Sequence, residues 1–217
     1  MVSLGYLEQG TWSHYCGGAI ISDDCIVTAA HCIFGKDLYK IDTQVMIGNT
    51  NFSDTSLGDQ GRIYEILAII KHPGYQGPNE YGEGYGPKGD LALVFTKTKI
   101  THLKVTQIPL IPANANLIDE QNYLCTKFGG WGWYDATHTA SNALRAADFC
   151  VFPKSICMEH FPNPKIQANL NSGLLICAGA DVSCTTYVIV NTYISSLILF
   201  YKRASVGLAK EIPDHLL

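Results

Sequence analysis

The chain has no large excess of charge of either sign, no basic stripe and no internal repeat. Its 15 Lys and Arg stand against 19 Asp and Glu, and the formal net charge is −4. A nucleic-acid-binding surface needs clustered positive charge, so we expect no nucleic-acid partner. The lack of a fixed repeat excludes a solenoid. At 217 residues, the chain is then one large domain or two small ones.

The sequence also lacks a clear targeting or membrane segment. Residues Met1–Tyr6 have no basic stretch followed by an apolar one, so they are not a signal peptide. We expect the chain to be a fragment or an incomplete gene model. The stretch Val182–Tyr201 carries no charge, but Asn191, Ser195 and Ser196 interrupt it, which disfavours a membrane span. We therefore expect no membrane partner.

No group of residues has the spacing of a metal site. Most of the histidines are dispersed, and none forms a ligand-spaced pair. These histidines are His14, His72, His102, His138 and His160. We therefore expect no metal and no cofactor.

Cysteine is abundant instead, with eight residues in the chain. That number is high for a cytosolic protein and indicates an oxidising compartment. The tripeptide Asn51-Phe52-Ser53 agrees, because it matches the acceptor pattern for N-glycosylation. We expect the parent protein to be extracellular.

Short β-rich runs separated by turn residues predict an all-β fold of barrel or sandwich type. Up to about residue 105 the runs are Val2–Leu4, Ala19–Ile21, Cys25–Ala29, Gln44–Ile47, Tyr64–Ile70 and Leu91–Phe95. Ile108–Pro112 then reads as a rigid connector, since proline cannot join a central ladder. A second set of runs begins at Asn122 and includes Tyr123–Cys125 and Ala143–Phe149.

Several motifs on these runs belong together. Cys16–Ile21 and Thr28–Cys32 resemble the catalytic-histidine region of the chymotrypsin-like serine peptidases. Gly89–Val94 resembles the aspartate segment of the same family, and Gly130–Gly132 and Ile176–Gly179 continue the likeness. The resemblance implies a double β-barrel.

The resemblance also implies roles for two residues. His31 would be the general base, and Asp90 the carboxylate that orients it. A buried carboxylate before an apolar strand is costly unless it is paired, and His31 is its natural partner. Two simpler interpretations stay open: His31 as a structural histidine beside a disulfide, and Asp90 as a turn residue. We expect His31 outside any helix, with its imidazole against Asp90.

The family's nucleophile segment, Gly-Asp-Ser-Gly-Gly, is absent from the sequence. The residues after Cys184 are Thr185–Ile189, with neither serine nor glycine, and Ser183 precedes the cysteine. Ser195 and Ser196 have no glycine beside them to form the tight turn of an oxyanion hole. We expect no peptidase activity from the chain as printed.

The likeness sets the expected domain boundaries. Residues 1–181 form the peptidase domain, and 182–217 form a divergent, non-native tail. Within the domain we expect a nearly complete first barrel over 1–105, a connector over 106–121 and a partial second barrel over 122–181. A closed barrel needs all of its strands, so the second one should be incomplete.

The resemblance implies two disulfides, which join Cys16 to Cys32 and Cys157 to Cys177. Two further cysteines match half-cystines whose partners would lie in the missing part, and they are expected as thiols: Cys125 and Cys184. The last two lie outside the family's common set, and whether they pair stays open: Cys25 and Cys150.

The leading hypothesis is a serine endopeptidase domain that cleaves protein or peptide substrates and can bind protein inhibitors. The floor of its primary pocket falls near Asp181, Val182 or Ser183. Asp181 would favour Lys or Arg in the substrate, but the matched position is Val182, so the sequence does not predict trypsin-like specificity. The alternative is a non-catalytic homologue that binds proteins through its barrel surface. A membrane-tethered fragment is a third hypothesis, based only on the uncharged tail.

Overall fold

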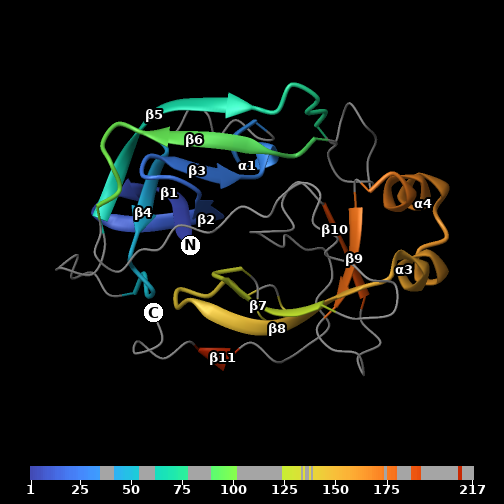
Figure 1. Cartoon of the computed structure of the whole chain (residues 1–217). Helices are drawn as coiled ribbons and strands as arrows, with labels where there is room; N and C mark the ends of the chain where they lie inside the picture. Colours follow the sequence, from blue (N-terminus) through green and yellow to red (C-terminus); the bar gives the residue numbers. More distant parts are fainter. Residues whose placement is uncertain are drawn as a thin grey trace. The chain divides into compact units, whose positions relative to one another are not determined.

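The chain forms two compact units, Met1–Leu110 with Pro213–Leu217, and Ile111–Ile212 (Figure 1). Their architecture comes from a computed structural model. The residues it describes are 1–34, 42–53, 62–77, 89–101, 124–132, 134, 137, 139–173, 175–179, 187–191 and 210–211. The expected connector, 106–121, lies outside these residues.

Six antiparallel strands of the first unit close into a barrel in the order β1-β2-β3-β6-β5-β4 (Figure 1). The strands are β1 (Val2–Glu8), β2 (Thr11–Ile20), β3 (Cys25–Thr28), β4 (Gln44–Ile47), β5 (Arg62–Lys71) and β6 (Ala92–Thr96). Strand β1 completes the ring because Val2 pairs with Gly18 on one side and with Ile47 on the other. Closure gives both sides of every strand a hydrogen-bonding neighbour, so the barrel has no open edge.

A tight hairpin joins β1 to β2. Gln9 and Gly10 both have positive φ, 51° and 80°, as the two central residues of a type I′ turn require. Because of this turn, both strands are longer than the predicted runs Val2–Leu4 and Ala19–Ile21: β1 extends to Glu8 and β2 begins at Thr11. The first half of β2 contains polar residues such as Thr11, Ser13 and His14, so it shows no apolar run by which the sequence could predict a strand. The turn fixes the register in which these residues pair with β1.

Close packing fills the interior of the barrel. Leu4, Ile26, Val45 and Val94 have no exposed surface. A side chain at Gly18 would meet this core, since a Cβ there would lie 2.8 Å from Cγ2 of Ile26. Such a distance is shorter than any comfortable carbon–carbon contact, so the packed core requires glycine at this position.

The second unit contains a five-stranded sheet. The order is β10-β9-β8-β11, and β7 also pairs with β8. The strands are β7 (Leu124–Gly130), β8 (Arg145–Phe152), β9 (Leu175–Gly179), β10 (Tyr187–Asn191) and β11 (Lys210–Glu211). Strands dominate both units, which confirms the all-β class. Strands β10 and β11 come from the segment that we expected to be a divergent tail, 182–217. The incompleteness of a second barrel stays a prediction.

The sequence analysis did not predict the two helices of this unit, α3 (Lys154–His160) and α4 (Pro164–Asn171). Helix α4 carries a recognisable start, because the side chain of Asn163 accepts a hydrogen bond from the Lys165 N–H (3.0 Å) and Pro164 follows it. Figure 1 shows the two helices side by side next to β9. Neither of these short helices has enough turns to show a clear helical period in the sequence.

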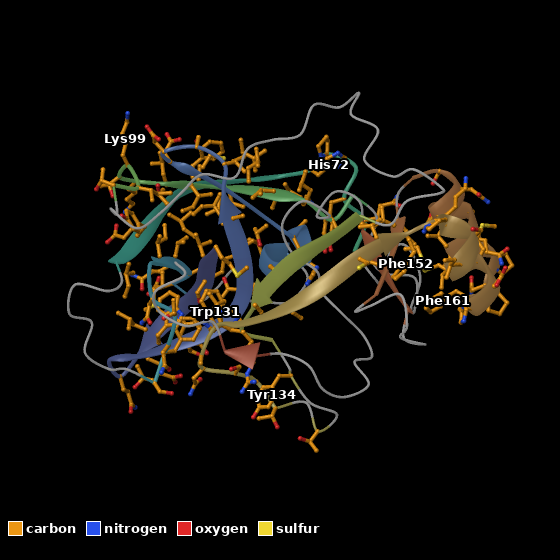
Figure 2. All side chains as sticks on the ribbon, turned by 60° about the horizontal axis from the view of Figure 1, so that its bottom comes forward. His72, Lys99, Trp131, Tyr134, Phe152 and Phe161 are labelled. Carbon is orange, nitrogen blue, oxygen red and sulfur yellow. A yellow bond between two sulfur atoms is a disulfide. The ribbon has the colours of Figure 1, made fainter. Side chains whose placement is uncertain are left out.

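A small core holds the helices to the sheet. Its buried members are Cys150, Phe152, Cys157, Leu170 and Cys177, with Phe161 packed against them (Figure 2). The predicted bond between Cys157 and Cys177 is confirmed, with sulfurs 2.06 Å apart, and it ties α3 to β9. None of the helices within the described residues has the length and apolar character needed to cross a lipid bilayer.

The remaining cysteines answer the open question about Cys25 and Cys150. Cys150 is disulfide-bonded, whereas Cys25 is a buried free thiol, so these two residues are not joined. They lie in different units, on β3 and β8. Burial and the nearby Asp24 carboxylate raise the pKa of the Cys25 thiol. With four cysteines paired in the two predicted bonds and Cys25 free, the partner of Cys150 is Cys125 or Cys184, so the expectation that both of these are thiols is wrong. Cys184 and the side chain of Cys125 lie outside what the structure describes.

Candidate active site

The short helix α1 (Ala30–Phe34) carries His31 and follows directly after β3. The last residue of β3, Thr28, donates its hydroxyl to the carbonyl of Gly17 on β2 at 2.9 Å. Ala29 and Ala30 come next and are completely buried. Small residues are needed here because the chain turns inside a packed interior.

A disulfide ties α1 back to the barrel. Cys32 bonds to Cys16 on β2, with sulfurs 2.05 Å and Cα atoms 6.1 Å apart, as the sequence predicts. Our expectation that His31 lies outside any helix is wrong. Five residues are too few to show a helical period, so the sequence displays only the strand before them.

His31 and Asp90 meet within the first unit through two hydrogen bonds. The ring Nδ1 of His31 lies 2.7 Å from Oδ2 of Asp90, and the backbone N–H of His31 donates to Oδ1 at 2.8 Å. An ionised carboxylate can only accept, so the proton of this pair sits on Nδ1. Nε2 is then the nitrogen of the neutral ring that carries a lone pair.

The two partners differ in exposure. The Asp90 side chain is 4% exposed, and that of His31 is 34% exposed. A carboxylate this deeply buried is costly unless charged or polar groups satisfy it, and His31 supplies both of the hydrogen bonds described. The carboxylate thus holds the imidazole at Nδ1, while part of the ring stays accessible to a reacting group.

A turn after β5 supports the backbone beside Asp90. The N–H of His72 donates to the carbonyl of Leu91 at 2.9 Å, and Nδ1 of His72 accepts from the N–H of Gly74 at 3.1 Å. Gly89 has a φ of 60°, and a Cβ there would lie 2.7 Å from the carbonyl oxygen of Gly74. Figure 2 labels His72 where the chain leaves β5. The turn thus fits closely against the residues that flank Asp90.

The sequence analysis missed His72 and Gly89 as supports of the pair. The contact joins two irregular segments that are distant in the chain, so no period or spacing points to it. A usable signal did exist: a glycine directly before an aspartate and an apolar strand allows the positive φ that this close approach requires.

One group within the described part of the chain has the proximity of a metal site. Ligand atoms of Cys16, His31 and Cys32 lie within 4.8 Å of one another. The two sulfurs are already joined in a disulfide, so neither can act as a thiolate ligand. The single imidazole nitrogen that remains is insufficient to hold an ion.

The other predicted elements of the site lie outside the described residues. They are the pocket candidates Asp181, Val182 and Ser183, the half-cystine Cys184, and the serines Ser195 and Ser196. The structure therefore brings together the two residues proposed as base and orienting group, and it describes no nucleophile.

Comparisons with known proteins agree with this geometry. The protein-family model described as Trypsin matches residues 1–185. Chymotrypsin-like elastase family member 1 of Felis catus is 28% identical over 182 residues, which is 83% of this chain and 61% of the relative. Trypsin zeta of Drosophila melanogaster is 26% identical over 184 residues, 82% of this chain and 60% of the relative. The chain thus spans about three fifths of the length of these relatives.

A solved structure shows the same fold. The serine protease neuropsin, from mouse brain, superposes with a TM-score of 0.60 at 20% identity, covering 85% of this chain and 71% of neuropsin. At this identity the likeness establishes the fold alone. The family match covers most of the chain, and its range includes both His31 and Asp90. The chain belongs to the trypsin family of chymotrypsin-like serine peptidases.

Proposed function

We propose that this chain supplies the general base and the orienting carboxylate of a serine endopeptidase, His31 and Asp90. The observation that carries the proposal is the 2.7 Å contact between Nδ1 of His31 and a buried oxygen of Asp90. The substrates would be peptide bonds of extracellular proteins, and protein inhibitors of the family would be further partners. The disulfides of both units support an oxidising compartment.

The geometry suits acid–base chemistry at Nε2. Because Asp90 holds the proton on Nδ1, the lone pair of Nε2 can accept a proton from an attacking hydroxyl. The imidazolium that forms is stabilised by the adjacent carboxylate, and it can then return the proton to the leaving amine. The second hydrogen bond, from the His31 N–H, fixes the rotation of the carboxylate during both steps.

We further propose that this chain alone does not hydrolyse peptides. Its sequence contains no Gly-Asp-Ser-Gly-Gly segment to supply the attacking oxygen and the oxyanion donors. Loss of the nucleophile costs a factor of about a million in kcat for enzymes of this type. The same absence, beside an intact first barrel, favours a second candidate function: a non-catalytic homologue that binds other proteins.

A fluorophosphonate probe tests the lack of a nucleophile directly. The purified chain should remain unlabelled under conditions that label a trypsin-family enzyme completely. Specific labelling of the native chain, abolished by heat denaturation, would overturn this part of the proposal. Binding of unrelated proteins by the unlabelled chain would support the non-catalytic candidate.

Proton NMR tests the orientation of the base. We expect a far-downfield Nδ1–H resonance from His31 that is lost in Asp90→Asn. The matched control is Asp23→Asn, which makes the same change at an exposed carboxylate of the same barrel and should leave the resonance in place. A resonance that is absent from the wild-type chain, or insensitive to Asp90→Asn, would contradict the proposed pairing.

Restoring the missing segment tests the catalytic roles. A chimera in which residues 185–217 are replaced by the corresponding segment of a trypsin-family relative should hydrolyse peptide esters. In that background, Asp90→Asn should lower kcat by about 10⁴-fold, because the wrong tautomer of His31 would be favoured. A folded chimera whose activity is unchanged by Asp90→Asn would show that Asp90 has no orienting role.

A further inference from the structure

The loop after β4 presents the tripeptide Asn51-Phe52-Ser53, which is the single Asn-x-Ser/Thr pattern in the whole sequence. Asn51 and Ser53 are exposed, whereas Phe52 between them is buried. Two local hydrogen bonds shape the turn. The N–H of Ser53 donates to Oδ1 of Asn51 at 3.0 Å, and the N–H of Asn51 donates to Oδ1 of Asn49 at 2.8 Å.

The buried Phe52 anchors this turn to the barrel. Its ring stacks on that of His14, with centroids 5.4 Å apart and planes 27° apart. Behind it, Nδ1 of His14 lies 2.7 Å from the Ser3 hydroxyl, which accepts the indole N–H of Trp12 at 2.8 Å. The apolar residue points inward, and its two neighbours are held at the surface.

This geometry fits a modified asparagine better than a structural one. A structural asparagine would use its amide inside the fold, but the Asn51 side chain is exposed and its turn uses only Oδ1. A sugar attached to Nδ2 leaves Oδ1 able to accept the Ser53 N–H. The modification therefore requires neither a new backbone conformation nor the loss of the observed hydrogen bond.

We propose that Asn51 is an N-glycosylation site. The donor is a lipid-pyrophosphate-linked oligosaccharide, used by the oligosaccharyltransferase of the secretory pathway. The bond formed joins Nδ2 of Asn51 to the anomeric carbon, and the bond broken is that between this carbon and the pyrophosphate oxygen. One amide proton is released, and the lipid pyrophosphate departs. The proposal does not depend on the roles of His31 and Asp90.

Cell-free translation with endoplasmic-reticulum microsomes tests the site without requiring secretion or folding. The full chain is placed behind a cleavable secretion leader, and its gel mobility is compared before and after treatment with peptide-N-glycosidase F. The wild-type chain should show one shift, which Asn51→Gln and Ser53→Ala abolish. The matched controls Ser53→Thr and Asn49→Gln should keep the shift. An unshifted wild-type chain, or a shift that survives Asn51→Gln, would overturn the proposal.

Mass spectrometry of chain secreted from animal cells tests the folded protein. Enzymatic release of the glycan in ¹⁸O water converts a glycosylated Asn51 to a labelled aspartate in the peptide that contains it. We expect this label on most of the secreted chain and not on material made in bacteria. Secreted chain in which Asn51 is entirely unmodified would refute the assignment.

Discussion

The two units of this chain solve the same problem, a small hydrophobic core, in different ways. The first closes six strands on themselves, and residues from all six strands line its core. The second, in the part described, sets two helices against a sheet and places the cystine Cys157–Cys177 at the centre of its core. In the first unit, which holds His31 and Asp90, the Cys16–Cys32 bond ties α1 to a barrel that strand closure stabilises. In the second unit the disulfide lies within the core itself and joins a helix to the sheet.

The largest effect should come from a cavity in the barrel. Ile26 has no exposed surface, and Ile26→Ala should lower the free energy of unfolding by about 4 kcal/mol. The matched control is Leu67→Ala on β5, where the side chain is 67% exposed and the loss should be within experimental error. Urea unfolding measures both. Equal losses for the two variants would contradict the picture of a closed, packed barrel.

Removal of the cystine should weaken the second unit alone. The bond closes a loop with a sequence separation of 20 residues, so Cys157→Ala with Cys177→Ala should cost about 3 kcal/mol. Hydrogen–deuterium exchange should accelerate in α3, α4 and β9 and remain unchanged in β1–β6.

The control for this variant is Cys25→Ala, which removes a buried sulfur that forms no disulfide. It should cost about 1 kcal/mol and act on the barrel instead. Faster exchange in the barrel after loss of the Cys157–Cys177 bond would argue against the separate roles of closure and cystine.

Acid should weaken the barrel through His14. Burial lowers the pKa of His14 from 6.5 to about 4. Between these values the unfolded chain binds a proton that the folded barrel excludes, so stability falls as the pH drops from 6.5 towards 4. The loss should reach about 3 kcal/mol at the acid end of this window.

Thermal unfolding at neutral and acid pH measures this loss. His14→Asn keeps a side chain that can hydrogen-bond to the Ser3 hydroxyl but cannot titrate in this range. The part of the pH dependence due to His14 should therefore disappear. A wild-type barrel that is equally stable across the window would contradict the burial of a neutral His14.

The smallest effect should come from the surface of the barrel. Lys97 and Glu65 form an ion pair at 2.6 Å, but both side chains are more than half exposed. The hydrogen bond and charge of Lys97 lower the pKa of Glu65. Exposed pairs add little to stability because water and salt screen them. Lys97→Met should leave the unfolding midpoint unchanged within error, and a large shift would mean that surface charge matters as much as closure.

Much of the barrel could be predicted because its strands are apolar and punctuated by turns. Gln44–Ile47 has the predicted bounds, β3 ends one residue earlier than predicted, and β6 is shifted by one residue at both ends. The helices α1, α3 and α4 were missed because each is too short for a helical period to emerge. The local pattern of apolar and turn residues thus located the apolar strands. It failed for short segments whose conformation depends on contacts with distant parts of the chain.

The family could be assigned from the amino-acid sequence alone, through the small, sulfur-bearing and ionisable residues around Thr28–Cys32 and Asp90. The sequence also determined the partners of two disulfides, since those cysteines fall at the family's positions. The folded structure was needed to show that His31 lies in helix α1, that Gly89 and the His72 turn fit against each other, and that Cys25 and Cys150 are not joined. The physical reason is that these features depend on contacts between distant segments, whose geometry exists only once the barrel has closed.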